Sequence, residues 1–379
     1  MEKMNVLYVF TFNYSLKTWS DSGTMSREIE RFKYLNQKYG IEFTLLTYGT
    51  KLEFGIIGNI PGIKIIPIFE KASKPQGKLQ TIFKSLLFLI KNKEKFKNIS
   101  VIKQNQLNGV WVSIFLKFLL KKPMIYRSGY DTYRFSKFEN KTFLKRTFFF
   151  LITNLTFICS DLITVTSNSD LKYSKNKYAA PNKIIVRRNW VEIGDNLNFE
   201  KRFDKRILVI GRLEDQKNIE KIINDFRDSE FTIDIIGSGS QLLKLKKISV
   251  EQDSKVNFLG TVDNSELSKI YSKYKYFIST SYFEGNPKTV LEAMANGCVV
   301  LISRIDNHLE LVDDGVNGFI EDLNVDFNEV IVKILDSDIN LSTISNNALR
   351  KVSELNSLEK ICEEEYGDFS SLINQKKTF

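Results

Sequence analysis

The chain has 379 residues, of which 42% are hydrophobic, enough to bury the cores of two domains. Its net charge of +10 is uneven: residues 1–200 carry 32 Lys and Arg against 15 Asp and Glu, and the remainder carries 23 against 30. Three widely spaced cysteines, Cys159, Cys298 and Cys362, argue against a zinc site or a complete disulfide framework, and the N-terminus lacks a signal-peptide pattern, so we expect a cytoplasmic protein.

Strand-like and helix-like segments alternate through the first half of the chain. The pattern predicts βαβ units and a parallel sheet. The apolar run at 147–158 contains Asn154 and is too short to span a bilayer, so we expect a buried helix there. The expected strands are 5–12, 43–49, 63–69, 100–104, 123–129, 161–167 and 183–190, and the expected helices are 26–40, 79–96 and 141–158.

The alternation restarts after a polar segment at 191–205. Strands are expected at 206–212, 231–239, 255–260, 275–281 and 298–303, with helices at 218–228, 265–274 and 288–297. The sequence therefore predicts an α/β protein with two Rossmann-like βαβ domains, 1–195 and 196–360, facing a central cleft. Residues 361–379 are expected to form a C-terminal helix that can fold back on the N-terminal domain.

The stretch EGNPKTVLE at 284–292 has the features of an anion site at a helix start. Asn286 is a suitable N-cap, and Pro287 is favoured at the first helical position. The amides near Lys288 and Thr289, with the positive end of the helix dipole, suit phosphate oxygens. Gly285 allows close approach of a ligand to the backbone.

Two carboxylates flank this phosphate site. Glu284 precedes the helix and Glu292 lies further along it, so one can accept hydrogen bonds from a ribose and the other from a sugar, as a nucleotide-sugar requires. Arg212 and Lys217, in GRLEDQKN at 211–218, lie where a strand ends, the edge at which open α/β sheets bind ligands. Two cations there can neutralise a departing diphosphate.

The order and spacing of these motifs resemble the C-terminal half of the family 4 glycosyltransferases, retaining enzymes of the GT-B fold. The resemblance rests on GRLEDQKN, IIGSGS, VNFLGTV, EGNPKTVLEAMANGCVVLIS and DDGVNGF, over about 205–325, and weakly on SDSGTMSREIE, FTLLTYG, DLITVTS and RRNWVE. It implies that Glu284 contacts the transferred sugar and Glu292 the ribose, while Arg212 and Lys217 bind the diphosphate. Donor-binding roles are implied also for Gly23, Gly237 and Gly260.

One departure from that family concerns the acceptor side. Many members have a histidine after the strand that here reads PMIYRSGYD, whereas the single histidine of this chain is His308, in the other domain. We expect a polar position near the cleft rim for His308. The missing role then falls to the residues that follow the strand, Arg127, Ser128, Tyr130 and Asp131.

The basic first half suggests a partner. Lysines at 91, 93, 95 and 97, and the group Lys141, Lys145 and Arg146, lie beside aromatic and aliphatic residues, which suits an anionic membrane surface. The alternative is a set of solvated faces without a partner.

The sequence therefore predicts a retaining glycosyltransferase that moves a hexose or N-acetylhexosamine from a nucleotide-diphosphate sugar, expected to be UDP-linked, to a lipid-linked or cell-surface glycan. We expect no cofactor and no essential metal, since Asp336 and Asp338 fall in a turn between helices, and a peripheral location at the inner face of the membrane. The alternatives are a nucleotide-sugar epimerase on the same fold and a basic nucleic-acid-binding protein. The latter lacks any nucleic-acid-binding motif, so no nucleic-acid partner is expected.

Overall fold

The computed structural model describes residues 3–194 and 198–377 and divides the chain into two compact units. The first runs to Arg187 and is completed by residues from Cys362 onward; the second is Arg188–Ile361. The division falls a few residues before the predicted boundary because Trp190 and Val191 are buried, Val191 in the core of the second unit.

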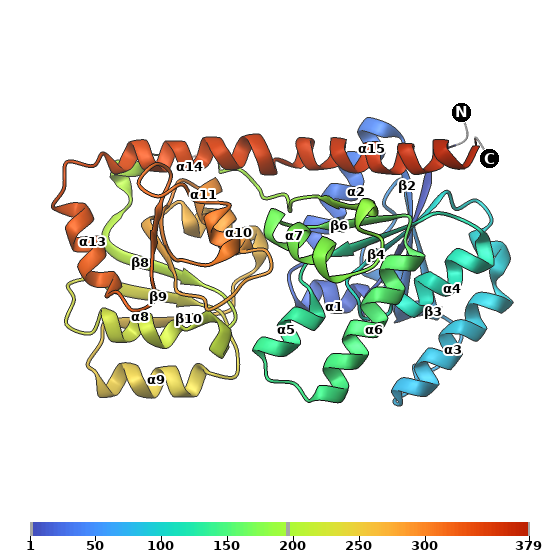
Figure 1. The fold of residues 1–379 in the computed structure, drawn as a ribbon, viewed down its shortest axis with the longest axis horizontal. Helices are drawn as coiled ribbons and strands as arrows, with labels where there is room; N and C mark the ends of the chain where they lie inside the picture. The colour runs from blue at the N-terminus through green and yellow to red at the C-terminus, as the bar shows by residue number, and fades with distance from the viewer. Residues whose placement is uncertain (1–2, 195–197, 378–379) are drawn as a thin grey trace. The chain divides into compact units, whose positions relative to one another are not determined.

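The first unit contains, in its described part, a seven-stranded parallel sheet of order β3-β2-β1-β4-β5-β6-β7 (Figure 1). The order reverses direction at β1, as in a doubly wound fold. The strands are β1 (Asn5–Val9), β2 (Glu42–Thr50), β3 (Ile63–Phe69), β4 (Val101–Asn105), β5 (Met124–Ser128), β6 (Leu162–Val165) and β7 (Ile184–Val186).

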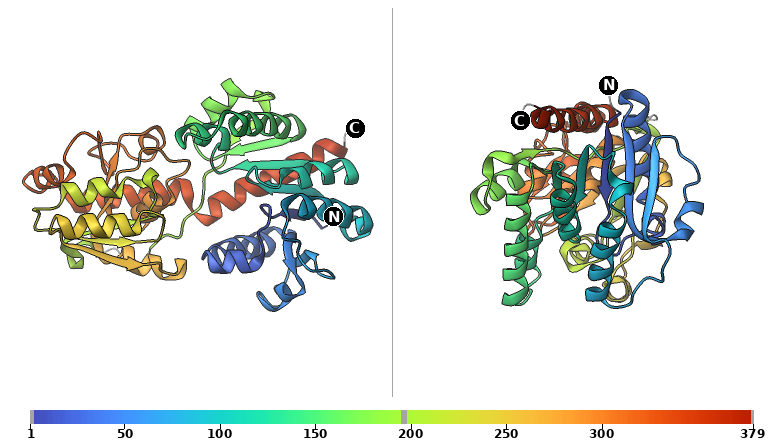
Figure 2. Two further views of the ribbon diagram at one scale, coloured as in Figure 1. Left: turned by 90° about the horizontal axis from the view of Figure 1, so that it is seen from below. Right: turned by 90° about the vertical axis from the view of Figure 1, so that its right-hand side faces the viewer.

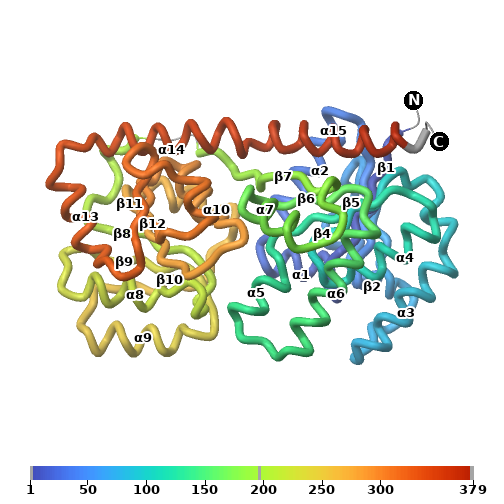
Figure 3. The backbone as a smooth tube through the Cα atoms, in the orientation of Figure 1, coloured from blue at the N-terminus to red at the C-terminus, as the bar shows by residue number. Residues whose placement is uncertain are grey.

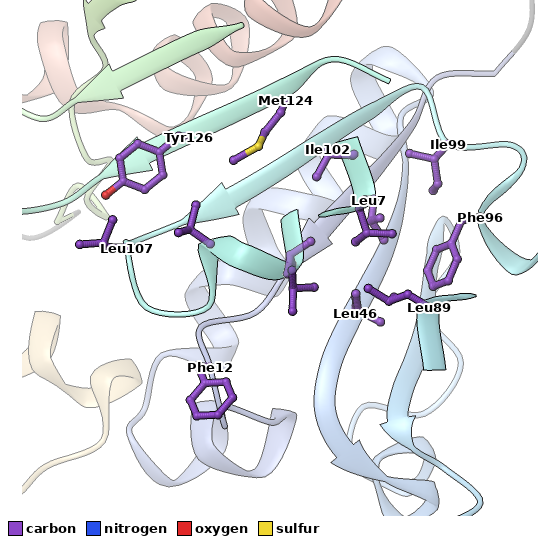
Figure 4. Close-up of a cluster of buried hydrophobic side chains, with 14 of the residues drawn as sticks. Leu7, Phe12, Leu46, Leu89, Phe96, Ile99, Ile102, Leu107, Met124 and Tyr126 are labelled. Atoms are coloured by element: carbon purple, nitrogen blue, oxygen red, sulfur yellow. The ribbon is translucent and has the colours of Figure 1, made fainter. Parts of the chain in front are cut away.

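Helices connect these strands and cover the sheet. Figure 4 shows part of the buried cluster between these helices and the sheet, in which Leu7 and Leu46 of the strands lie near Leu89 of a helix. The helices are α1 (Leu16–Asp21), α2 (Met25–Tyr39), α3 (Lys78–Lys91), α4 (Val110–Leu120), α5 (Thr132–Phe138), α6 (Phe143–Cys159) and α7 (Asn168–Lys177), with 3₁₀ turns η1 (Lys51–Gly55), η2 (Lys93–Phe96) and η3 (Pro181–Lys183).

The second unit has a six-stranded parallel sheet in the described residues, of order β10-β9-β8-β11-β12-β13 (Figure 3). Alternate residues of one strand enter different cores, Val299 and Leu301 one cluster and Val300 and Ile302 another, so both faces of the sheet are covered. The strands are β8 (Phe203–Ile210), β9 (Thr232–Ile236), β10 (Val256–Gly260), β11 (Tyr274–Ser279), β12 (Val299–Ser303) and β13 (Phe319–Glu321). The helical segments are η4 (Phe199–Lys201), η5 (Asp215–Lys217), α8 (Ile219–Asp225), α9 (Leu242–Glu251), α10 (Asn264–Tyr271), α11 (Lys288–Ala295), α12 (Asp306–Leu309), α13 (Phe327–Leu335) and α14 (Leu341–Asn356).

The last helix, α15 (Leu358–Lys377), is fixed to the first unit by buried ion pairs. Glu365 accepts hydrogen bonds from Arg31 at 2.9 Å and from Lys103. The helix runs beside α2 (Figure 2), where the rings of Tyr39 and Tyr366 stack with centroids 4.2 Å apart. A buried charge is costly unless it is paired, so these contacts fix the position of α15 on this unit.

The expectation of a buried helix at 147–158 is wrong. In α6 the side chains of Phe148, Leu151, Leu155 and Ile158 are exposed, and the helix buries Thr153, Thr156 and Phe157 instead. No helix in the described part of the chain is both long and apolar enough to cross a membrane.

Candidate functional site

The carboxyl ends of β8 and β9 are packed backbone against backbone. A Cβ on Gly237, whose φ is 146°, would lie 1.9 Å from the carbonyl oxygen of Gly211, and one on Gly239 would lie 2.3 Å from that of Leu213. Only glycine fits such an approach. Leu213 N donates to Ser238 O at 2.9 Å, so the Gly-Ser-Gly-Ser turn fixes the segment that carries Arg212.

Lys217 and Glu284, distant in sequence, form an ion pair at this edge of the sheet. The Lys217 Nζ to Glu284 Oε1 distance is 2.5 Å, and the two side chains are only 15% and 7% exposed. Ser281 Oγ donates to the same carboxylate oxygen at 2.7 Å. The pair forms because Lys217 ends the turn η5 after β8 while Glu284 follows the adjacent strand β11. The structure therefore brings together two of the three predicted catalytic residues.

The loop that carries Glu284 rests on buried polar side chains that the sequence analysis did not identify. Asn307 Nδ2 donates to the carbonyl oxygen of Glu284 at 2.7 Å and also to that of Gly285, and Ser303 Oγ donates to Ser281 O at 2.7 Å. The backbone around the carboxylate is thus held from below by hydrogen bonds. The Ser-x-x-Glu spacing of Ser281 and Glu284 was the one signal in the sequence that indicated part of this support.

His308 lies fully buried beneath this loop, so its predicted position at a polar rim is wrong. Its Nδ1 is 2.7 Å from Ser303 O, and burial lowers the pKa of the imidazole to about 4, although nearby Glu284 opposes the shift. Nδ1 therefore donates as N–H to the carbonyl oxygen, and the ring is neutral at physiological pH.

The buried imidazole gives a prediction for stability. The unfolded chain takes up a proton near pH 6.5 and the folded chain only near pH 4, so stability present above pH 6.5 is lost as the pH falls. Between pH 7.5 and 5.0 this loss is about 2 kcal/mol, from 1.36 kcal/mol per pKa unit. Urea unfolding of the wild type and of His308→Asn, whose amide can still donate to Ser303 O, measures it. Equal losses in both proteins would contradict the assignment.

The helix α11 begins at Lys288, with Pro287 in the cap position, so the prediction of Asn286 as N-cap is wrong. The φ and ψ of Pro287, −75° and 71°, take the chain directly into the helix, and no side chain caps it. The Lys288 N–H donates to Asn286 O at 2.8 Å, while Pro287 O accepts from the Val290 N–H. The predicted use of the Lys288 amide for phosphate therefore requires that this contact opens.

Glu292 lies on α11 with donors on both carboxylate oxygens. Lys288 Nζ is 2.7 Å from Oε1, and Tyr271 OH donates to Oε2 at 3.2 Å. Burial holds the pKa of Tyr271 well above its usual value, so its hydroxyl remains protonated and donates. The same hydroxyl is 3.3 Å from Thr289 O. Lys288, Thr289 and Glu292 thus form one polar group on the first turns of α11.

The remaining donor residues predicted in this unit lie around the same edge. Arg212 is exposed, with its Nη2 3.5 Å from Gln216 Oε1. Gly260 ends β10 with a φ of 75°, and its carbonyl oxygen accepts from the Gly237 N–H at 2.7 Å. Gly285 is buried in the loop before α11. These positions follow from the strand order, since parallel strands end at one edge.

The predicted acceptor residues belong to the first unit. Arg127 and Ser128 end β5, and Asp131 caps α5 by accepting from the Arg134 N–H at 2.6 Å. Burial raises the pKa of Asp131 and lowers that of Arg127. Tyr130 is exposed.

Gly23, predicted to approach the donor, lies in the first unit between α1 and α2 with a φ of 67°. Its role in donor binding stays a prediction.

Cys298 and the pair Asp336 and Asp338 occupy ordinary structural positions. Cys298 is buried in the core, and burial raises the pKa of its thiol to about 12. Asp336 and Asp338 lie between α13 and α14, with Asp336 at the C-terminal cap of α13. Over residues 3–194 and 198–377, no group of three or more His, Cys, Asp or Glu is placed to hold a metal ion.

Solved structures share this fold over nearly the whole chain. Sucrose-phosphate synthase of Thermosynechococcus elongatus superposes with a TM-score of 0.76 at 16% identity, covering 98% of this chain and 100% of that one. HepE of Anabaena, solved with UDP and glucose, gives 0.73 at 15% identity over 97% and 100%. These similarities show the GT-B fold, with its two Rossmann-like domains, and confirm the predicted fold class.

Curated relatives are glycosyltransferases. An uncharacterised glycosyltransferase of Methanocaldococcus jannaschii is 23% identical over 69% of this chain and 71% of its own length. A GDP-mannose-dependent alpha-mannosyltransferase of Corynebacterium glutamicum is 25% identical over 42% of this chain. The chain spans only 35% of that enzyme, and less than half of two further relatives.

The sequence model of the family described as Glycosyl transferases group 1 matches residues 195–351. That range contains the Lys217–Glu284 pair and the polar group on α11. The fold, the relatives and this match together support a transferase enzyme of a glycosyltransferase family, as predicted from the sequence.

Proposed function

We propose that the protein is a retaining glycosyltransferase that transfers a hexose or N-acetylhexosamine from a nucleotide-diphosphate sugar, with UDP as the nucleotide, to a lipid-linked or cell-surface glycan. The observation that carries the proposal is the pairing of Lys217 with Glu284 at the edge where β8 and β11 end. A cation and a carboxylate so placed can serve a diphosphate and a sugar at once.

The residues of the second unit can be matched to the successive parts of a nucleotide-sugar. Glu292 accepts from the ribose hydroxyls, and Arg212 and Lys217 carry the diphosphate together with the start of α11, which presents Lys288 and Thr289. Glu284 accepts from the hydroxyls of the sugar. Gly237 and Gly260, where β9 and β10 end, are assigned to the nucleoside. Solved structures of similar fold contain UDP and UDP-glucose, which supports this donor class.

The proposed reaction needs no enzymic base. The bond between the anomeric carbon and the diphosphate oxygen breaks, and the acceptor oxygen bonds to the same face of that carbon. The acceptor proton passes to the departing diphosphate, so the products are the glycoside and the protonated nucleoside diphosphate. Charge develops on the leaving group, where Arg212 and Lys217 stabilise it. With these two cations, a divalent metal has no necessary task in the proposed mechanism.

The first unit is assigned to the acceptor. The residues proposed to orient the accepting hydroxyl are Ser128, Tyr130 and Asp131, which follow β5; Arg127 is nearby but belongs to the buried charge cluster with Arg31. The basic character of residues 1–200 supports an acceptor carried on an anionic membrane at the cytoplasmic side.

A panel of nucleotide-sugars tests the proposal. A UDP-hexose or UDP-N-acetylhexosamine at about 100 times its dissociation constant should stabilise the native protein by about 2.7 kcal/mol, measured as a shift in thermal unfolding. With a glycolipid acceptor and EDTA present, UDP should be released, and NMR should show the donor's anomeric configuration in the product. Inverted product, inactivation by EDTA, or sugar epimerisation without UDP release would contradict the proposal.

A further inference from the structure

The helix α3 exposes a stripe of apolar side chains. Its buried positions are Thr81, Ser85 and Leu89, spaced four residues apart, and the hydroxyls of Thr81 and Ser85 donate to the backbone carbonyls of Gly77 and Thr81. The exposed side chains are Leu79, Phe83, Leu87 and Ile90, with Leu79 83% and Phe83 68% exposed. The packed side is apolar as well, because Ile82, Leu86 and Phe88 contact the core, so α3 carries apolar side chains on both sides, unlike an amphipathic helix that faces water.

The helix α6 also carries apolar side chains on its exposed side, while Phe157 is buried and Phe150 and Ile152 pack against the core. Its buried threonines, Thr153 and Thr156, donate to the carbonyls of Phe149 and Ile152. The exposed apolar residues recur at alternating spacings of four and three, which is one stripe along a helix. They are Leu144, Phe148, Leu151, Leu155 and Ile158, between 46% and 80% exposed.

The two stripes belong to one layer of the first unit. Leu89 of α3, Leu116 of α4 and Phe157 of α6 enter the same buried cluster, so all three helices cover one face of the sheet. The helix α4 packs against both α3 and α6 (Figure 1) and adds the exposed ring of Phe118. We name the outer sides of α3, α4 and α6, with their exposed apolar residues, the outer face.

The helix α2 of the same unit shows the usual arrangement. It buries Ile29, Phe32 and Leu35 and places lysines such as Lys33 and Lys38 in water. The outer face thus differs from the exposed side of α2. Exposed apolar surface gathered in this way marks a site of interaction rather than a solvated surface.

The charges of the outer face identify the partner. The sequences of α3, α4 and α6 contain Lys78, Lys84, Lys91, Lys117, Lys145 and Arg146 and no acidic residue. Basic side chains that alternate with leucine and phenylalanine on a helix are typical of segments that lie in the interface of an anionic bilayer. Aliphatic stripes have no counterpart on a nucleic acid, whose phosphates would be met by charge alone.

We propose that the outer face docks on an anionic phospholipid bilayer by inserting the apolar stripes of α3 and α6 between the headgroups. The lysines of α3, with Lys145 and Arg146 of α6, contact the phosphates of the lipids, whereas Lys117 is paired with Asp161 at 2.6 Å. This inference rests on the proposed function, because a lipid-linked acceptor requires the enzyme to work at a membrane surface. It differs from attachment by charge alone, since apolar insertion persists when salt screens the charges.

Flotation of the full chain with vesicles tests the proposal. The wild type should float with vesicles of phosphatidylglycerol and phosphatidylcholine, and a part of that binding should persist at about 1 M salt, where charges are screened within about 3 Å. The triple variant Phe83→Ser/Phe148→Ser/Leu151→Ser should lower the partition coefficient at least about tenfold and lose the salt-resistant part. The variant Lys84→Glu/Lys145→Glu should lose binding mainly at low salt.

The matched control is Leu243→Ser/Val250→Ser/Val316→Ser, which changes equally exposed apolar residues of the second unit and should bind as the wild type does. Equal binding by the outer-face variant, or an equal loss in the control, would overturn the proposal. So would a wild-type dimer that the outer-face variant converts to a monomer without any vesicle binding. Stabilisation by UDP, measured in parallel, separates the two proposals: it should be unchanged in every variant, and its absence in the wild type would count against the donor alone.

Discussion

Replacing Glu284 with glutamine should lower the turnover of sugar transfer by at least about a hundredfold while leaving UDP affinity within about twofold. The amide keeps the size of the carboxylate and can still accept from Ser281 Oγ, which lies 2.7 Å from the present Oε1. It has no charge to hold Lys217 or to oppose positive charge developing on the sugar. UDP lacks the transferred sugar, so its binding reports the contacts to the base, the ribose and the diphosphate alone. Turnover from radiolabelled donor and UDP titration by calorimetry measure the two effects.

Glu292→Gln provides the matched control, because this carboxylate is also paired with a lysine, Lys288, at 2.7 Å. We expect this variant to lose UDP affinity several-fold, since its proposed partner is the ribose. Its turnover at saturating donor should change far less than that of Glu284→Gln. If Glu284→Gln lost UDP affinity while Glu292→Gln kept it, the roles assigned to the two glutamates would be reversed.

The sequence predicted the fold because its signals are local and repeated. Alternating strands and helices specify a parallel sheet, and the motifs indicate Lys217 at a strand end and Glu284 at the start of a helix. The ion pair itself could not be predicted, since 67 residues separate its members and its geometry depends on how β8 and β11 pair. The hydrogen bonds of Asn307 to the loop of Glu284 could not be predicted either, because they depend on how the segment after β12 is placed.

The two clearest errors have a common physical origin. The apolar run at 147–158 predicts a buried helix, and the prediction for the lone histidine is a polar position near the cleft rim. In α6 the packed side combines Phe157 with threonines, whose hydroxyls donate to the backbone four residues earlier, and a second set of apolar residues stays exposed on the other side. His308 can be buried because its ring is neutral and its Nδ1 donates a hydrogen bond to Ser303 O. Neither the exposed stripe of α6 nor the burial of His308 can be predicted without knowing how the neighbouring elements pack.

Removing the amine of Lys217 should have an effect as large as that of changing Glu284. In Lys217→Ala the leaving diphosphate loses a cation, and Glu284, 7% exposed, is left without its charged partner. We expect turnover to fall by about 10²-fold or more, and stability to fall by about 1–3 kcal/mol, the cost of an unsatisfied buried polar group. Lys217→Arg should also be poorly active, since the planar guanidinium does not fit where the amine lies 2.5 Å from the carboxylate.

A double-mutant cycle with Glu284→Gln separates the two losses. The combined variant removes the unpaired charge, so its stability should recover toward that of the wild type, whereas its turnover should remain at the level of the worse single variant. Chemical denaturation and single-turnover kinetics on the same four proteins measure both quantities. Arg212 is exposed and its Nη2 lies 3.5 Å from Gln216 Oε1, so Arg212→Ala should reduce turnover without a loss of stability. Full activity in Arg212→Ala/Lys217→Ala would refute the leaving-group role, because no cation assigned to the diphosphate would then remain on the segment that follows β8.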